Sequence, residues 1–188
     1  MNSAVSGNES DKTGGRPAIL LKQGGLPSDP PAPVQSLDAL RLPLSGTRLI
    51  EASAGTGKTY TVAQLYLRLV LGHGPEREVD GRVKPTAFAR ALTPPEILVV
   101  TFTDAATNEL RDRIRQRLGE AANVFEAGVA EQTGDAPQAD FSPPADLLAL
   151  RDDFASGDWA GCAKLLRVAA DWMDEAAVST IHSWCYRM

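Results

Sequence analysis

The sequence predicts an α/β fold in which a parallel sheet is flanked by helices. Two short apolar runs, RLIEA at residues 48–52 and EILVVTF at residues 96–102, have the length and composition of buried strands. A glycine-rich turn and a helical pattern of apolar residues separate the two runs. Strand, turn, helix and strand in this order form a βαβ unit, so we expect the two strands to be parallel.

Three stretches carry apolar side chains at helical spacing. The first predicts a helix over about residues 58–71, ended by Gly72 and Gly74. The second predicts a helix over about residues 104–122, with Arg111, Arg113, Arg115 and Arg117 on or beside its polar face. A third helical stripe runs from Cys162 to Met173. The three stripes consist of Val62, Leu65, Tyr66, Leu69 and Val70; of Ala106, Leu110, Ile114, Leu118 and Ala121; and of Cys162, Leu165, Leu166, Ala169, Ala170 and Met173.

Two further segments complete the expected order of elements. Residues 127–146 are polar and contain prolines, which is typical of a surface loop. The run AAVSTIHSW at residues 176–184 predicts a short third strand that turns into a helix, which the end of the chain interrupts.

Composition and charge are those of one medium-sized globular domain. Apolar residues make up 43% and charged residues 23% of the 188 residues, which argues against wholesale disorder. A chain of this length can bury one real hydrophobic core. The net charge of −5 argues against nucleic-acid binding through bulk positive charge, but it leaves room for a local basic surface.

The chain begins with a segment that predicts a flexible N-terminal leader, residues 1–36. Gly, Pro, Ser and Asn dominate it without a sustained period. Its apolar run AILL is too short for a signal-peptide core or a membrane span. Cys162 and Cys185 lack zinc-site spacing and cannot make a disulfide framework, so we expect buried thiols and a cytoplasmic location.

The segment ASAGTGKT, residues 52–59, carries the strongest functional signal. It matches the phosphate-binding loop GxxxxGK[ST] except that Ala52 stands at the first glycine. A triphosphate is wrapped by backbone N–H groups at a helix N-terminus, which favours small residues such as Gly55 and Gly57. A glycine-rich turn with a solvated lysine is the alternative, but the flanking strand and helix favour nucleotide binding.

The last two residues of the motif carry the charge chemistry. Lys58 can reach the β and γ phosphates, and the Thr59 hydroxyl can ligate a magnesium ion that bridges them. We therefore expect ATP and Mg²⁺ as cofactors. The residues expected to bind them are Ala52, Ser53, Ala54, Gly55, Thr56, Gly57, Lys58 and Thr59, with Lys58 and Thr59 in catalytic roles.

Three segments, in this order and spacing, resemble the first three conserved blocks of superfamily 1 helicases of the UvrD type. They are LIEASAGTGKTYTVAQLYLRLVLG, ILVVTFTDAATNELRDRIRQRL and MDEAAVSTIHSWCYRM. Within that group the sequence is most similar to the RecB family, the beta subunits of exodeoxyribonuclease V, over roughly residues 38–188. The resemblance implies a P-loop NTPase (RecA-like) fold, with residues 37–188 as the N-terminal part of the ATP-binding domain and therefore an incomplete first motor domain.

The resemblance also implies a function. RecB-like proteins are ATP-dependent DNA helicase and exonuclease subunits that act in double-strand break repair and recombination. Their partners are single-stranded DNA, duplex DNA ends, and the RecC and RecD subunits. By position in the family blocks, the expected DNA contacts are Thr101, Phe102, Thr103, Arg111, Thr180 and His182.

Each of these DNA contacts has a structural alternative. Phe102 can be a core aromatic that caps its strand. Thr101 and Thr103 can cap helices, and a lone histidine is more often structural than functional. Arg111 and its neighbouring arginines alternate with acidic residues, so their helix face can be a solvated, salt-bridged surface instead of a DNA path.

Phosphoryl transfer needs an acidic pair that holds magnesium and an arginine that meets the developing charge. Asp174 and Glu175 precede an apolar stretch, which is the wrong side for such carboxylates, and Gln35 is a weak candidate for reading adenine. We therefore expect the chain alone to bind nucleotide without hydrolysing it. Another P-loop NTPase, such as a small kinase, and a non-catalytic DNA-binding or partner-binding module remain alternatives.

Overall fold

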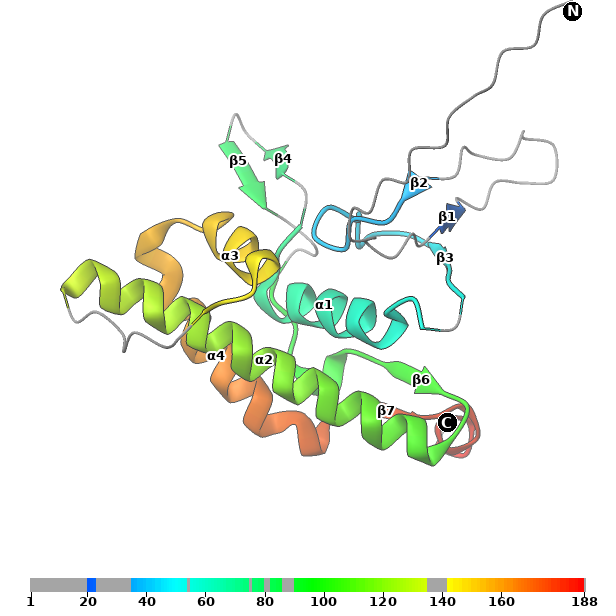
Figure 1. The fold of residues 1–188 in the computed structure, drawn as a ribbon. Coiled ribbons are helices and arrows are strands. Elements are labelled where there is room, and N and C mark those ends of the chain that lie inside the picture. Colours follow the sequence, from blue (N-terminus) through cyan, green and yellow to red (C-terminus); the bar gives the residue numbers. More distant parts are fainter. Residues whose placement is uncertain are drawn as a thin grey trace, which may run out of the picture.

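The structure is a computed structural model that describes residues 20–22, 35–53, 55–74, 76–79, 82–85, 90–134 and 142–187. It contains both helices and short strands, so the chain is α/β (Figure 1). The strands are β1 (Leu20–Lys22), β2 (Gln35–Ser36), β3 (Leu49–Glu51), β4 (Glu76–Val79), β5 (Arg82–Pro85), β6 (Val99–Thr101) and β7 (Val178–Thr180). The α-helices are α1 (Lys58–Leu71), α2 (Asp104–Thr133), α3 (Ala145–Asp152), α4 (Trp159–Asp171) and α5 (Ile181–Cys185), with 3-10 turns at Pro94–Glu96, Ser156–Asp158 and Trp172–Glu175.

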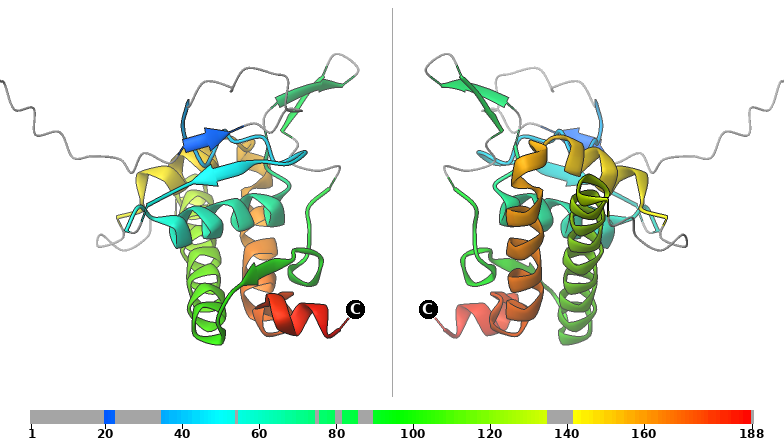
Figure 2. Two further views of the ribbon diagram at one scale, coloured as in Figure 1. Left: turned by 90° about the vertical axis from the view of Figure 1, so that its right-hand side faces the viewer. Right: turned by 90° about the vertical axis from the view of Figure 1, so that its left-hand side faces the viewer.

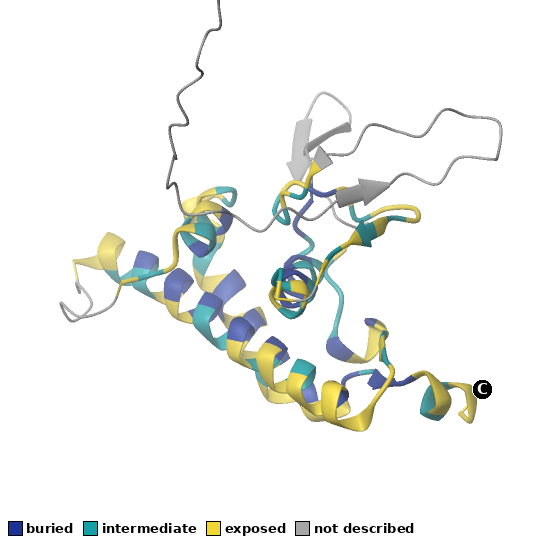
Figure 3. Cartoon of the chain, turned by 45° about the vertical axis from the view of Figure 1, so that its right-hand side comes forward, coloured by how far each residue is buried: buried dark blue, intermediate teal, exposed yellow. Residues whose placement is uncertain are grey.

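The hydrophobic core lies among three helices. Helices α2 and α4 lie side by side, and α1 crosses them (Figure 2). Buried residues gather in the middle of α2, while most residues of its first turns are exposed (Figure 3). Burial of each large apolar side chain contributes about 1.5–3 kcal/mol. The core includes Leu67, Ile114, Leu118, Phe125, Leu150, Leu166 and Met173.

The ends of α1 agree with the prediction from the glycines. Gly72 follows the last helical residue with φ 66°, and its N–H donates to the carbonyls of Arg68 and Leu69. A left-handed glycine with such bonds is a common way for a helix to end. The buried side chains of α1 are not confined to the predicted stripe, because Val62, Leu65 and Leu69 are only half-buried, whereas Gln64 and Arg68 are buried.

The strand pairing differs from the prediction. Strand β3 pairs antiparallel with β1, and β6 pairs in parallel with β7. Among the described residues β3 and β6 are therefore not neighbours in one sheet. An apolar run identifies a strand but not its partner, and here the parallel crossover runs from β6 through α2 and α4 to β7. The expected third strand at residues 176–184 and the following helix are confirmed as β7 and α5.

The strands are also less buried than predicted. Leu49 in β3 is 53% exposed, and Val100 in β6 is 40% exposed. Strand β7 is buried along its length. Cys162 is a buried thiol as predicted, whereas the prediction for Cys185 is wrong because that thiol is exposed.

The second helix is longer than predicted, and the predicted loop at residues 127–146 is wrong at both ends. Helix α2 continues to Thr133, because Val124, Phe125 and Gly128 extend its buried face. Helix α3 then begins at Ala145, and its Leu147 and Leu150 side chains are buried in the core. Residues 135–141 lie outside the described part of the chain, as does most of the predicted leader, of which Leu20–Lys22 and Gln35–Ser36 form strands.

Candidate functional site

The turn between β3 and α1 has a backbone conformation suited to a glycine-rich motif. Gly55 and Gly57 have φ angles of 75° and 82°, in a region that residues with side chains seldom adopt. Gly57 immediately precedes α1, and no side chain caps the helix there. The first N–H groups of the helix are thus suited to an anion. Ala54, a predicted site residue, lies outside the described residues.

The Lys58 ammonium lies against the loop. Its Nζ donates to the carbonyl oxygen of Ser53 at 2.5 Å and to that of Ala52 at 3.2 Å. The Thr56 hydroxyl donates to the same Ser53 carbonyl at 2.7 Å, which closes the turn. Lys58 is exposed and Thr59 is half-buried. The loop therefore presents a positive charge and a hydroxyl group next to the N-terminus of α1.

A cavity of about 520 Å³ opens beside the loop, between α1 and α2. Pockets that bury small molecules measure about 300–1,000 Å³, so a ligand the size of a nucleotide fits this volume. Its lining mixes cations, carboxylates and small residues. The loop and α1 contribute Gly55, Gly57, Lys58, Thr59, Tyr60 and Ala63, and α2 contributes Glu109, Arg113, Gln116, Arg117 and Glu120.

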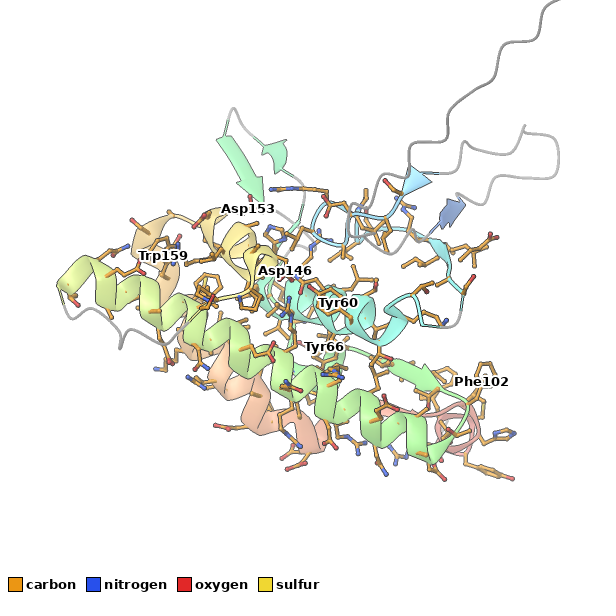
Figure 4. The ribbon with its side chains drawn as sticks, in the orientation of Figure 1. Tyr60, Tyr66, Phe102, Asp146, Asp153 and Trp159 are labelled. Atoms are coloured by element: carbon orange, nitrogen blue, oxygen red, sulfur yellow. The ribbon has the colours of Figure 1, made fainter. Side chains whose placement is uncertain are left out.

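The α2 side of the cavity contains a buried arginine, Arg117, which is 5% exposed. Its Nη2 donates to the Tyr60 hydroxyl at 3.0 Å and to the Asp146 carboxylate. Its Nε donates to Gln64 at 3.1 Å, and its Nη1 donates to Glu120 at 3.2 Å. Tyr60 and Asp146 lie together beside α1 (Figure 4). Arg117 thus joins the loop end of α1 to both α2 and α3.

The Arg117 cluster was not foreseen as part of the site, and the prediction that Arg117 lies on or beside the polar face is wrong. The signal was present in the spacing, because Arg117 follows Ile114 by three residues and adjoins Leu118 in the apolar stripe. A charge inside such a stripe implies a buried partner. Burial, followed by the hydrogen bond to Asp146, raises the pKa of Tyr60 to about 12, so its hydroxyl remains a donor at neutral pH.

The predicted DNA contacts come together at one end of the β6–β7 pair. Thr101 and Thr180 are partners in the parallel register, so the chain leaves both strands side by side. Phe102 follows β6 and is 87% exposed, and it lies at the opposite end of the molecule from Trp159 (Figure 4). The alternative of Phe102 as a core aromatic is therefore wrong. His182 is exposed on α5.

The capping alternative is confirmed for Thr103 but not for Thr101, which lies in β6, and Thr180 also caps a helix. Thr103 caps α2, where its hydroxyl accepts from the Ala106 N–H at 3.1 Å, and Thr180 caps α5 by accepting from Ser183. The Thr101 hydroxyl lies 2.6 Å from that of Thr107. These bonds hold the ends of both strands in place. The same bonds occupy hydroxyl groups that were expected, from their positions in the family blocks, to contact DNA.

Arg111 connects α2 to β7. Its Nη2 donates to the Val178 carbonyl at 2.9 Å, while its buried Nε has no hydrogen-bond partner among the described residues. Its neighbour Arg115 pairs with Asp112 and with Asp174. The alternative in which this helix face is a salt-bridged surface is therefore confirmed for Arg115. Arg111 makes a structural contact instead, to the Val178 carbonyl.

Asp174, Glu175 and Gln35, which were considered from the sequence for binding magnesium and adenine, lie in other elements of the fold. Asp174 and Glu175 lie in a 3-10 turn before β7, and neither lines the cavity. Gln35 belongs to β2. In the part of the chain that the structure describes, no three acidic, histidine or cysteine side chains gather as a metal centre would require. None of its described helices is long and apolar enough to cross a membrane.

Comparison with known proteins finds clear relatives. Residues 34–188 match the family described as UvrD/REP helicase N-terminal domain. The chain is 49% identical over 156 residues to the RecBCD enzyme subunit RecB of Escherichia coli (strain K12), which covers 82% of this chain and 11% of that protein. It is 42% identical over 152 residues to RecB of Haemophilus influenzae, covering 81% of this chain and 11% of that protein. RecB of Mycobacterium tuberculosis is 32% identical over 145 residues, covering 77% of this chain and 11% of that protein. The chain spans about a tenth of the length of these curated relatives.

Proposed function

The chain belongs to the UvrD/REP helicase N-terminal domain family, and from this premise we propose that it is the ATP-binding front portion of a RecB-type DNA helicase. The observation that carries the proposal is the loop at Gly55 and Gly57. Both glycines have positive φ, and Lys58 begins the helix that follows. The loop combines a helix N-terminus, a lysine and a hydroxyl group beside a cavity of nucleotide size.

The fold proposed for the complete domain is that of a RecA-like P-loop NTPase. The order of strand β3, glycine turn and α1 supports this proposal, whereas the antiparallel pairing of β3 with β1 is not part of it. The parallel pair β6–β7 supports the proposal as a second element of the same fold. The boundaries at residues 1–36 and 37–188 remain predictions.

The residues of the loop suit a nucleotide triphosphate and its magnesium ion. The backbone N–H groups at the start of α1 would hold phosphate oxygens, and Lys58 would exchange its bonds to Ser53 and Ala52 for bonds to phosphate. The Thr59 hydroxyl would be one magnesium ligand. When bound, ATP with Mg²⁺ supplies the energy of phosphoryl transfer. Ser53 and Thr56 shape the turn without a charge of their own.

DNA binding is proposed at the end of the β6–β7 pair. Phe102, with its exposed ring, is suited to stack on a base. Thr101, Thr103, Thr180 and His182 lie at or just after the same strand ends, and Arg111 contacts the first residue of β7. All five are proposed to contact the backbone of the DNA strand. For the three threonines this means a shared role, since each hydroxyl also bonds within the protein.

The proposal for the complete protein follows its relatives. Their printed name, RecBCD enzyme subunit RecB, supports a multisubunit assembly, and we propose RecC, RecD, single-stranded DNA and duplex ends as partners in double-strand break repair and recombination. Exonuclease activity belongs to the same proposal. The free thiols of Cys162 and Cys185 fit the cytoplasmic location that we propose.

Nucleotide binding without turnover is proposed for the chain alone. Hydrolysis needs carboxylates that hold magnesium and an arginine that meets the transferred phosphoryl group. Among the described residues, Asp174 and Glu175 do not line the cavity, and Asp174 is engaged with Arg115 at 2.5 Å.

The proposal is tested by titrating a fluorescent ATP analogue into the chain with Mg²⁺. Lys58→Ala is expected to abolish detectable binding, because it removes the cation that meets the phosphates. Lys164→Ala is the matched control, since Lys164 is an exposed lysine on α4. Equal affinity in Lys58→Ala and the unaltered chain would disprove the site. Transfer of phosphate to a small acceptor, with no effect of single-stranded DNA, would favour a kinase over a helicase.

A further inference from the structure

Helix α3 holds both ends of α1 through two aspartates. Asp146, in the first turn of α3, accepts hydrogen bonds from Tyr60 and Arg117 at the loop end of α1. Asp153, which follows α3, lies 2.9 Å from His73 at the other end. Both aspartates lie near α1, at separate positions (Figure 4). Asp146 pairs with a buried guanidinium close to the phosphate loop, whereas Asp153 pairs with the His73 imidazole and with Arg41 at the end of α1 that is remote from the loop.

The contact at the loop end centres on Arg117. Its guanidinium makes hydrogen bonds to four side chains from α1, α2 and α3, and it also lies 4.9 Å from the centre of the Tyr60 ring. Hydrogen bonds to a charged group are stronger than those between neutral groups. The cluster thus fixes the side chain of Tyr60 more firmly than apolar packing alone would, although the ring is 45% exposed.

The position of Tyr60 gives the cluster its significance. Tyr60 directly follows Thr59 and is separated from Lys58 by one residue, so all three share the first helical turn. The N-terminus of that helix has no side-chain cap of its own, and uncapped turns fray. Tyr60 and Arg117 also line the cavity next to the loop. A bond at Tyr60 therefore restrains the turn whose N–H groups, lysine and hydroxyl face the ligand.

We propose that Arg117, Tyr60 and Asp146 form a positioning cluster that holds the first turn of α1, and with it Lys58 and Thr59, in the conformation that binds the phosphates of a nucleotide. The inference rests on the proposed function. These residues act through Lys58 and Thr59, and a preordered turn avoids the cost of ordering at the moment of binding. Loss of the cluster weakens nucleotide binding even where the chain remains folded.

The test uses Asp146→Asn and Tyr60→Phe in the complete 188-residue chain. Asp146→Asn removes the charge that pairs with Arg117, and Tyr60→Phe keeps the ring but removes its hydroxyl. Affinity for a fluorescent ATP analogue is expected to fall about tenfold or more for Asp146→Asn, as the loss of one hydrogen bond to a charged group implies, and less for Tyr60→Phe. The ratio of ATP to AMP affinity should fall as well, because the positioned groups address the β and γ phosphates.

Asp153→Asn is the matched control, because it alters an aspartate contact at the far end of α1. Thermal melting is measured for all variants, and binding is measured well below each melting temperature. An unchanged affinity in Asp153→Asn, at a comparable loss of melting temperature, supports positioning. Affinity losses that follow melting temperature in all variants would overturn it.

The two proposals fail in distinguishable ways. If Lys58→Ala abolishes binding but Asp146→Asn and Tyr60→Phe bind normally, the positioning cluster is rejected and the nucleotide site stands. If the chain binds no nucleotide with or without Lys58, the proposed function fails, and the cluster's role with it. Should Asp146→Asn not fold, Tyr60→Phe decides the question, because removing one hydroxyl from a half-exposed ring leaves the core intact.

Discussion

The guanidinium Nε of Arg68 donates to the imidazole Nδ1 of His73 across 3.0 Å, although both side chains are almost completely buried. Since an arginine can only donate, Nδ1 accepts, and the His73 proton sits on Nε2, which bonds to Asp153 at 2.9 Å. Arg68 also donates to the Ala39 and Leu42 carbonyls. Burial lowers the pKa of Arg68 to about 10, so it remains a cation at neutral pH. The imidazole beside it is accordingly held neutral.

Stability is expected to fall in acid through His73. Burial lowers the pKa of His73 below its usual 6.5, and the nearby Arg68 charge lowers it further, while the bond to Asp153 opposes the shift. Below about pH 6.5 the unfolded chain therefore binds a proton that the native chain excludes, so stability falls as the pH falls, by up to about 1.4 kcal/mol per pH unit. Above about pH 6.5, His73 is neutral in both the native and the unfolded chain, so its contribution to stability no longer changes with pH.

Urea unfolding at several pH values between 5 and 8 checks this dependence. His73→Gln keeps a donor and an acceptor but cannot titrate, so the stability difference between the variant and the unaltered chain should shrink as the pH falls. His182→Gln, which alters an exposed histidine, is the control and should leave the slope as it is. A difference that stays constant with pH for His73→Gln would contradict the assignment.

Gly128→Ala is expected to destabilise the chain. A methyl group at this position would lie 2.7 Å from Cε3 of the Trp159 ring and 3.1 Å from Arg151, where the guanidinium stacks at 4.6 Å from the ring centre. Overpacking of this kind costs about 1–3 kcal/mol. Chemical denaturation measures the change.

Gly119→Ala, in the same helix, is the matched control. No atom lies within 4 Å of the added methyl group there, so the higher helix propensity of alanine should stabilise the chain by up to about 1 kcal/mol. If Gly128→Ala lowers the stability of the chain and Gly119→Ala raises it, the close approach of α2 to Trp159 is established. Equal gains would show that the two helices lie farther apart at Gly128.

Phe102→Ala is expected to weaken binding of single-stranded DNA without loss of stability. The ring is 87% exposed, so its removal takes little apolar surface from the core, whereas stacking on a base contributes about 1–3 kcal/mol. Fluorescence anisotropy with a labelled oligonucleotide measures the affinity. Val168→Ala removes an exposed apolar side chain from α4 and should bind normally. Unchanged affinity in Phe102→Ala would remove Phe102 from the proposed DNA contacts.

Arg111→Met separates a structural role from a DNA contact. The loss of its bond to Val178 at 2.9 Å should reduce stability by about 1–3 kcal/mol. If Arg111 also meets a phosphate, the slope of log affinity against log salt for single-stranded DNA should decrease by about 0.7. Melting and salt titration measure the two effects independently. A full salt slope at reduced stability would leave Arg111 with its structural role alone.

The features that sequence predicted are those with a local cause. Gly72 ends α1 because its backbone conformation is intrinsic to glycine, and the motif around Lys58 specifies a turn followed by a helix. Phe102 and Thr180 were placed at the strand ends by their position after apolar runs. Each of these depends on a few neighbouring residues.

The features that sequence missed depend on residues far apart in the chain. The partner of β3 is β1, and that of β6 is β7, which local periodicity cannot specify. Helix α2 runs on past residue 122 because Phe125 packs edge-to-face against Phe154, at 5.7 Å between ring centres. Gly128 and the polar residues Glu131, Gln132 and Thr133 hid that continuation.

Helix α2 also has mechanical properties that follow from its length. Its 30 residues make a rod of about 45 Å, and Arg117 lies near the midpoint. The half that carries Phe125 and Gly128 is clamped by its neighbours, whereas most residues of the first turns after Phe102 are exposed. A bend of about 10° at Arg117 would displace the N-terminal end by about 4 Å, as 1.5 Å per residue implies. Restraint on the helix is thus strongest around Gly128 and weaker at the end that adjoins the strands.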